Sequence, residues 1–224
     1  MKFEFGVSSN TPSNTKLSNG YTLYDWVMRQ RCFPAFWSRP LSGENAITKE
    51  EVAFLKDKNC KILLLFNDFT EAQISSNDGE KEALQVIDKV RELGIAQWEH
   101  IAIAVDVPSE WSINHNWMLG FSTILNANGI VPAFIGNTDS SKNFNFDRQS
   151  SHYVQAFGNE NPFETIFGAK EPKVDGVPTT WTPYAPSALI PEDIKLWECG
   201  KMFYHDIELS EQYVIDSSVL DYMC

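Results

Sequence analysis

Carboxylates that follow apolar runs are the residues of this sequence best placed to do chemistry. The run Ile101–Val105 ends abruptly in Asp106, and the Val107-Pro108 step that follows interrupts a regular strand. An unbroken apolar run is typical of a strand covered on both faces, as in the parallel sheet of an α/β protein. Asp106 is therefore either a loop-pinning or helix-capping group or a member of a functional site.

Other polar residues follow further strand-like runs in the same way. In a (β/α)8 barrel the functional groups sit at the carboxyl ends of the strands. The polar and aromatic residues at the predicted strand ends are Ser8, Ser9, Arg39, Asn67, Asp68, Asp106, Asn137, Asp139, Trp181, Tyr184 and Glu198. Acids can transfer protons at a glycosidic bond, amides can bind hydroxyls, and aromatic faces can stack on sugar rings. This combination indicates a carbohydrate site.

The apolar runs alternate with segments that have a helical pattern. Thr48 and Glu51 have the spacing of a capping box, and Val52 and Leu55 provide an apolar stripe behind them. A second helical segment covers residues 78–94 and ends at a glycine, the residue favoured at a left-handed helix cap. Alternation of this kind predicts an α/β fold with a parallel sheet.

Eight apolar segments are candidate strands: KFEFGVSS, CFPAFWS, CKILLLF, IAIAV, IVPAFI, ETIFGA, TTWTPYA and IKLWECG. They predict a single (β/α)8 TIM-like barrel over residues 1–224, since the compact end of that fold is about 200 residues. Prolines recur after residue 160, so we expect the C-terminal third to be irregular. An open doubly wound sheet is the alternative, but the segment after the first strand, GVSSNTPSNTKLSNG, lacks a glycine-rich phosphate loop.

The charge balance limits the partners of this chain. There are 30 acidic and 18 basic residues, and the net charge of −12 argues against binding to nucleic acid or to an anionic membrane. The N-terminus shows no signal peptide and no segment is long enough to span a bilayer, so we expect a cytoplasmic protein or one exported by a non-classical route. The oligomeric state stays open.

Neither the cysteines nor the histidines form a recognisable ligand pattern. The four cysteines lack a C-x-x-C pair and the four histidines lack metal-ligand spacing, so we expect no metal, cofactor or disulfide framework. A metal-dependent hydrolase built on Asp68, Asp106 and histidines is an alternative that requires these ligands to cluster.

The chain resembles the glycoside-hydrolase-like barrel family, TIM-barrel domains of long-unassigned function that are related to the family 25 lysozymes, the muramidases. The resemblance runs from Phe3 to about Asp216 and depends on the order and spacing of several modest motifs. The segments that carry it are FEFGVSSN, ITKEEVAFLKDKNCKILLLFND, DGEKEALQVIDKVRELGI, HIAIAVDV, KLWECG and YVIDSS.

Several acids of the family pattern are replaced in this chain. The family's first strand usually carries Gly-x-Asp, where this sequence has Gly6-Val7-Ser8. The muramidases end their fourth strand in Asp-x-Glu, where this sequence has Asp106-Val107-Pro108. At the acid of the third strand stands Asn67, with Asp68 beside it. Trp197-Glu198 stands where the pattern has Trp-Gln.

The resemblance implies a glycoside-hydrolase-like domain that acts on or binds a carbohydrate such as a bacterial cell-wall polysaccharide. Asp216 matches the aspartate of the family's last strand, so the predicted catalytic acids are Asp106, Glu198 and Asp216. The predicted substrate-binding residues are Ser8, Arg39, Asn67, Asp68, Asn137, Trp181 and Tyr184. Because the muramidase set is incomplete, binding without cleavage and a non-catalytic structural or protein-interaction module both remain as alternatives.

Overall fold

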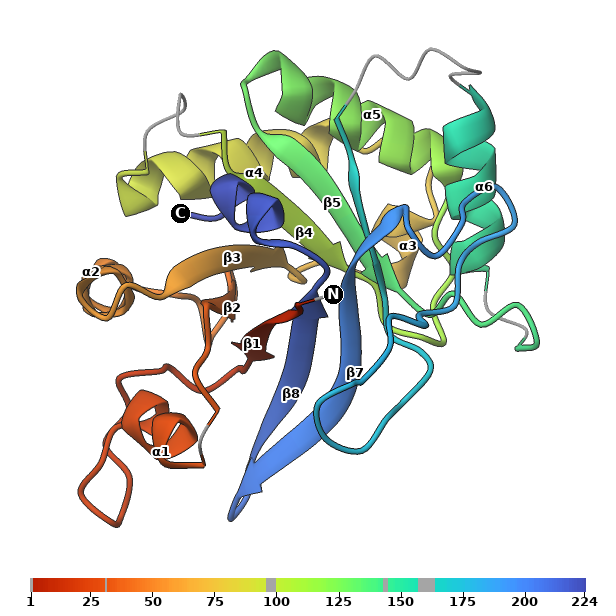
Figure 1. Ribbon diagram of the computed structural model, residues 1–224. Coiled ribbons are helices and arrows are strands. Elements are labelled where there is room, and N and C mark those ends of the chain that lie inside the picture. Colours follow the sequence, from red (N-terminus) through yellow and green to blue (C-terminus); the bar gives the residue numbers. More distant parts are fainter. Residues whose placement is uncertain (1, 31, 96–99, 143–144, 157–163) are drawn as a thin grey trace.

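Eight strands form a closed barrel in which each strand pairs with its neighbours in sequence order (Figure 1). The computed structural model describes residues 1–224 apart from 1, 31, 96–99, 143–144 and 157–163. The strands are β1 (Glu4–Ser8), β2 (Phe36–Pro40), β3 (Lys61–Phe66), β4 (Ala102–Asp106), β5 (Val131–Gly136), β6 (Ile166–Ala169), β7 (Ile194–Tyr204) and β8 (Ile207–Val214). The predicted TIM-like α/β barrel is confirmed.

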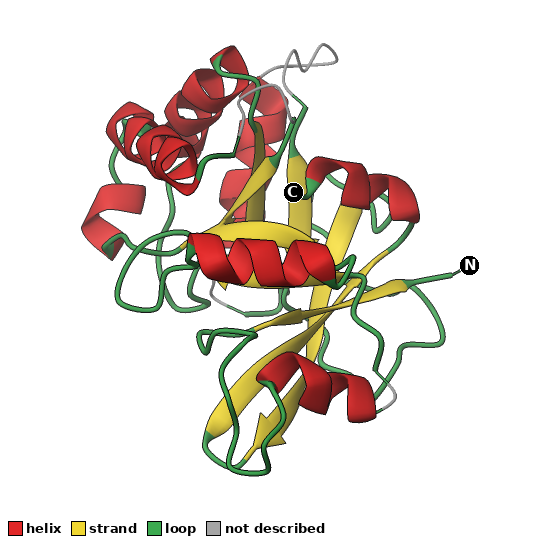
Figure 2. Cartoon of the chain, turned by 90° about the vertical axis from the view of Figure 1, so that its left-hand side faces the viewer, coloured by secondary structure: helices red, strands yellow, loops and turns green. Residues whose placement is uncertain are grey.

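Helices connect the first six strands and lie outside the barrel (Figure 2). They are α1 (Leu23–Arg29), α2 (Lys49–Asp57), α3 (Glu71–Ile74), α4 (Glu80–Leu93), α5 (His115–Ala127) and α6 (Phe146–Ala156). Thr22 and Thr70 each close a capping box at the start of α1 and α3, and Gly94 ends α4 in the left-handed conformation. Among the described residues, no helix is long and apolar enough to cross a membrane.

The last third of the barrel departs from a regular strand–helix repeat, as the prolines predict. Residues 170–193 contain no helix, and a tight hairpin joins β7 directly to β8. Strands β1 to β7 are parallel, whereas β8 runs antiparallel to both β7 and β1. In a regular (β/α)8 barrel all eight strands are parallel, so the antiparallel β8 is a departure from that pattern.

The predicted seventh strand, TTWTPYA, was wrong. Residues 179–185 form an irregular loop, and the eighth strand of the barrel is Ile207–Val214. This strand, IELSEQYV, mixes polar and apolar residues instead of presenting an apolar run. The reason is that it belongs to a hairpin whose two faces have different surroundings, so only one residue in two is apolar.

Small and branched side chains fill the barrel interior. They include Leu63 and Leu65 of β3 and Ala102 and Ala104 of β4. Val219 and Met223 of the C-terminal segment, which contains the short helix η2 (Ser217–Tyr222), belong to the same cluster and close the end of the barrel where the parallel strands begin. The open end, where β1 to β7 finish, is called the mouth below, and the inward-facing polar side chains lie there.

Candidate active site at the mouth of the barrel

Strand pleating directs one polar side chain from each of several strands into the mouth. Ala102 and Ala104 face the interior, so Asp106, two residues further along β4, faces the same way. The same alternation places Glu198 two residues beyond the interior Leu196, and Gln212 two residues before the interior Val214. Lys170 follows the last residue of β6. These residues come from widely separated parts of the sequence and meet at the mouth.

Asp106 and Lys170 form a partly buried ion pair. The Nζ of Lys170 lies 2.5 Å from Oδ1 of Asp106 and donates a hydrogen bond of 3.0 Å to the carbonyl oxygen of Val107. The two side chains are 13% and 28% exposed, for lysine and aspartate respectively. Burial opposes the charge of Lys170, but Asp106 and Glu198 outweigh it and raise the pKa of Lys170 above its ordinary value. The lysine is therefore a fixed positive charge beside Asp106.

Glu198 is held by a chain of two hydrogen bonds. The fully buried hydroxyl of Ser38 donates to Oε1 of Gln212 at 2.5 Å, and Nε2 of Gln212 donates to Oε2 of Glu198 at 2.9 Å. Because the hydroxyl satisfies the amide oxygen, the amide nitrogen is the group that faces the carboxyl. Ser38 and Gln212 thus fix the orientation of Glu198.

The surroundings of Glu198 favour its protonated form. Burial raises the pKa of Glu198, and the negative charge of Asp106 raises it further. Lys170 and the hydrogen bond from Gln212 act in the opposite direction but do not cancel these effects. A carboxyl with a raised pKa beside a second, ion-paired carboxyl is the arrangement that general acid catalysis requires.

The structure does not bring Asp216, a predicted catalytic acid, together with Asp106 and Glu198. Asp216 is exposed and lies just beyond Val214, which pairs with Glu4 at the start of β1. Because β8 is antiparallel, its end lies at the closed end of the barrel, opposite Asp106. There Oδ1 of Asp216 accepts a hydrogen bond of 2.8 Å from the amide of Ser218 and caps η2.

Arg39, a predicted substrate-binding residue, does not reach the mouth. Its side chain is fully buried, and Nε lies 2.9 Å from Oε1 of Glu51 in α2. Ser38, the preceding residue of β2, faces the interior, so Arg39 points outward between the barrel and α2. Thr48 caps α2 as predicted, but the side chain of Glu51 pairs with this arginine.

Trp181 packs behind the barrel wall. Its ring lies 5.8 Å from that of Trp197, which faces away from the interior, and 5.5 Å from that of Phe3, while its Nε1 donates to the carbonyl oxygen of Pro191. Asn137 is 5% exposed, and its side-chain oxygen accepts a hydrogen bond from the amide of Asp139. These contacts give Trp181 a packing role. Asn137 follows the interior Ile135 by two residues, so it faces the mouth, where its side chain also stabilises the turn after β5.

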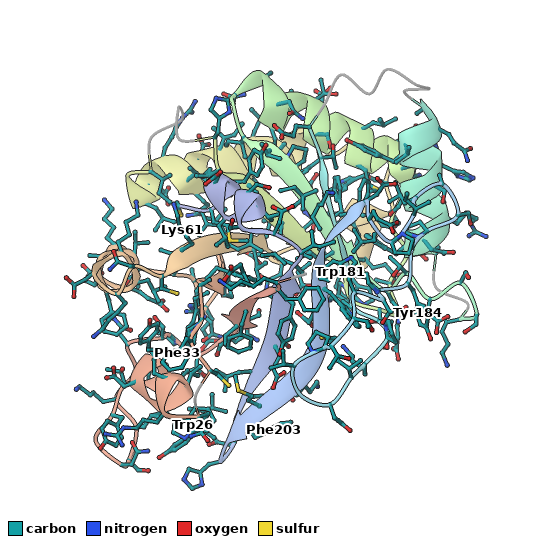
Figure 3. The ribbon with its side chains drawn as sticks, in the orientation of Figure 1. Trp26, Phe33, Lys61, Trp181, Tyr184 and Phe203 are labelled. Atoms are coloured by element: carbon teal, nitrogen blue, oxygen red, sulfur yellow. The ribbon has the colours of Figure 1, made fainter. Side chains whose placement is uncertain are left out.

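The remaining predicted binding residues lie around the rim of the mouth. Ser8 is partly exposed and pairs in register with Ser38. Asn67 and Asp68 are exposed and line a hollow of about 200 Å³ beside the end of β2. Tyr184 is 43% exposed (Figure 3). Its backbone amide donates a hydrogen bond to the carbonyl oxygen of Glu171, the residue after Lys170, and its own carbonyl oxygen accepts one from the hydroxyl of Thr138.

Sequence reasoning missed Lys170, Gln212 and Ser38. Lys170 directly follows the apolar segment ETIFGA, so the rule that identified Asp106 would also have identified Lys170. No local signal marks Ser38 and Gln212, because their contact joins residues 174 positions apart. Among the described residues, no group of three His, Cys, Asp or Glu side chains is placed to hold a metal ion.

Replacing Lys170 with methionine is expected to raise the pKa of Glu198 further. The lysine's positive charge stabilises the ionised form of Glu198, so its loss makes that carboxyl harder to deprotonate. Carboxyl-carbon NMR of labelled glutamate, followed over a pH titration, measures the change. Lys173→Met is the matched control, because Lys173 is exposed and its effect on Glu198 is the smallest of the contributing causes. Equal shifts in the two variants would contradict this role of Lys170.

Comparison with solved structures shows the same fold in several proteins. An uncharacterised protein of B. stearothermophilus has a TM-score of 0.80 at 18% identity, with 99% of this chain and 100% of that chain covered. The catalytic domain of endolysin ply40, from bacteriophage P40 of Listeria monocytogenes, has a TM-score of 0.57 at 13% identity, covering 98% and 96%. The Clostridium perfringens spore cortex lytic enzyme SleM has a TM-score of 0.51 at 10% identity, covering 95% and 66%.

No family model matches this sequence, and no curated protein does. The resemblance to the family 25 lysozymes therefore stays a prediction, and the comparisons show the barrel fold. At these low identities the similarity establishes a shared barrel, and the proteins that share it include cell-wall lytic enzymes.

Proposed function

We propose that this protein binds a glycan across the mouth of the barrel and hydrolyses one of its glycosidic bonds. The observation that carries the proposal is the carboxyl of Glu198, held by Gln212 at the mouth together with the ion pair of Asp106 and Lys170. Glycosidases generally use two carboxyl groups, one that donates a proton and one that acts as a carboxylate. The mouth supplies both groups.

In this mechanism Glu198 donates its proton to the oxygen of the glycosidic bond as that bond breaks. Positive charge develops on the sugar, and the carboxylate of Asp106 stabilises it. Lys170 fixes the position of the Asp106 carboxylate through the 2.5 Å contact. Water completes the reaction at the anomeric carbon, and Glu198 is reprotonated for the next cycle.

The proposed substrate is a bacterial cell-wall-type polysaccharide. Its support is the fold shared with an endolysin catalytic domain and a spore cortex lytic enzyme. Ser8, Asn67, Asp68 and Tyr184, around the rim, are the proposed contacts for hydroxyl groups and sugar faces.

Calorimetry followed by mass spectrometry tests the proposal. Wild type and Asp106→Asn are titrated with muropeptides and N-acetylglucosamine oligomers, and the same mixtures are then searched for cleavage products. The expected result is binding by both proteins and cleavage by wild type alone. Asp216→Asn is the matched control, since it makes the same substitution at the closed end of the barrel and asparagine preserves the helix cap.

Two outcomes would reject the proposal in different ways. Binding without cleavage by wild type would leave a glycan-binding protein with no hydrolase activity. The absence of both binding and cleavage would favour a non-catalytic interaction module on the same barrel.

A further inference from the structure

The β7–β8 hairpin continues past the rim of the barrel. Strand β6 pairs with β7 only as far as Trp197, and β1 pairs with β8 only as far as Ser210. Between these two points the strands pair with each other alone, through to Tyr204 and Ile207. Figure 1 shows this hairpin extending away from the other strands, with the turn at its far end.

One face of the hairpin continues the inner wall of the barrel. Residues that pair across an antiparallel ladder share a face, and every second residue of a strand lies on that face. Glu198 pairs with Gln212, and both side chains lie in the mouth. A β-bulge between Glu198 and Gly200 shifts the register of β7 by one residue, so on this strand the face continues at Lys201 and Phe203. Lys201 pairs with Ser210 and Phe203 pairs with Glu208, and these four residues extend the same face.

The opposite face of the hairpin is packed against the rest of the protein. Leu209 is fully buried, and Met202 and Ile207 pack against the main hydrophobic core. The ring of Tyr204 lies 5.3 Å from that of Trp26 in α1, and its hydroxyl is 2.9 Å from that of Ser18. These contacts fix the orientation of the hairpin and leave its inner face open.

An aromatic ring occupies this open face. Phe203 is 58% exposed, and Lys201 and Glu208 beside it form an ion pair of 2.5 Å with both side chains 49% exposed (Figure 3). Phe203 pairs with Glu208, and Glu198 pairs with Gln212, four residues further along β8. At the usual rise per strand residue, the two pairs lie about 13 Å apart along the hairpin. A single sugar ring bound at Glu198 does not reach this far.

We propose that Phe203 is the stacking platform of a second sugar subsite, which makes the protein selective for linear glycans of several units. This inference rests on the proposed glycan site at the mouth and extends it along the hairpin. The apolar face of a sugar ring packs on the phenyl ring, while Lys201 and Glu208 at its edge bind hydroxyl or amide groups. A disaccharide bound at Glu198 ends before Phe203, whereas a longer chain reaches it.

Calorimetry with oligomers of different length tests this subsite. N-acetylglucosamine oligomers of two and of six units are titrated into Glu198→Gln, which leaves the ligand intact, and into the same protein carrying Phe203→Ala. We expect Phe203→Ala to weaken binding of the hexamer about tenfold and to leave binding of the dimer unchanged. Phe33→Ala is the matched control, because Phe33 is an aromatic residue that is 68% exposed in the segment before β2.

The two proposals fail in distinguishable ways. If Phe203→Ala binds the hexamer as tightly as its parent, the second subsite is rejected while the site at the mouth stands. If the parent binds neither oligomer and wild type cleaves neither, the glycan site itself is rejected, and the second subsite with it. Thermal unfolding checks that each variant is folded, which we expect for a substitution at an exposed side chain.

Discussion

Replacing Glu198 with glutamine is expected to lower the rate of glycoside hydrolysis about 10²–10⁴-fold, the usual contribution of a general acid. Glutamine has nearly the same shape, and its side-chain oxygen can still accept the hydrogen bond from Gln212. It has no proton to give to the leaving oxygen. Binding of the glycan is therefore expected to persist while cleavage is lost.

The same substitution is expected to stabilise the folded protein at neutral pH. The pKa of Glu198 is raised in the folded state, chiefly by burial, so folding strengthens the binding of its proton. The stability contributed by this group is fully present below the unfolded pKa, about 4.3, and is lost as the pH rises through the raised folded value. Glutamine never ionises, so its advantage over glutamate is absent below the unfolded pKa, grows as the pH rises from there to the raised folded pKa, and is complete above that value.

Urea unfolding at several pH values and product analysis by mass spectrometry measure the two effects. Glu211→Gln is the matched control, because burial also raises the pKa of Glu211, which lies in β8 on the face opposite to that of Gln212. It should show a similar dependence of stability on pH with no loss of activity. If Glu211→Gln lowered activity as strongly as Glu198→Gln, or if the latter stayed active, the assignment of Glu198 as proton donor would be withdrawn.

Replacing Arg39 with methionine is expected to reduce the free energy of unfolding by about 3–5 kcal/mol, because it leaves the charge of Glu51 buried without its partner. The substitution also disturbs the hydrogen bonds that hold the loops after β1 and β2. Arg39 donates hydrogen bonds to the carbonyl oxygens of Ser9 and, at 2.9 Å, Asn45. Oε1 of Glu51 accepts hydrogen bonds from the amide and hydroxyl of Ser13 at 2.6 and 2.9 Å.

Urea unfolding followed by tryptophan fluorescence gives the free-energy difference. Lys89→Met is the control, since Lys89 makes an exposed pair with Glu92, and exposed pairs contribute little to stability because water and salt screen them. A small loss for Arg39→Met, equal to that of the control, would mean that Glu51 is not left uncompensated. In that case the Arg39–Glu51 ion pair would not stabilise the loops that follow β1 and β2.

The sequence could place Asp106 and Glu198 at the mouth because each comes directly after apolar residues of a strand, Asp106 at the end of β4 and Glu198 within β7. An unbroken run such as Ile101–Val105 requires cover on both faces, and the pleat then fixes which residue beyond it faces the interior. The same reasoning could not separate Arg39 from Ser38. Adjacent residues of a strand point to opposite sides, and only packing against α2 shows that the arginine is on the outside.

The sequence by itself determined the fold class, the positions of most strands and two of the acids, because hydrophobic periodicity and helix caps are local signals. Tertiary structure decided the rest. The hairpin after Tyr204 reverses the chain, so Asp216 lies at the closed end of the barrel and Gln212 lies beside Glu198. Strand direction and contacts between distant residues depend on how the whole barrel closes, and no local run of residues encodes them.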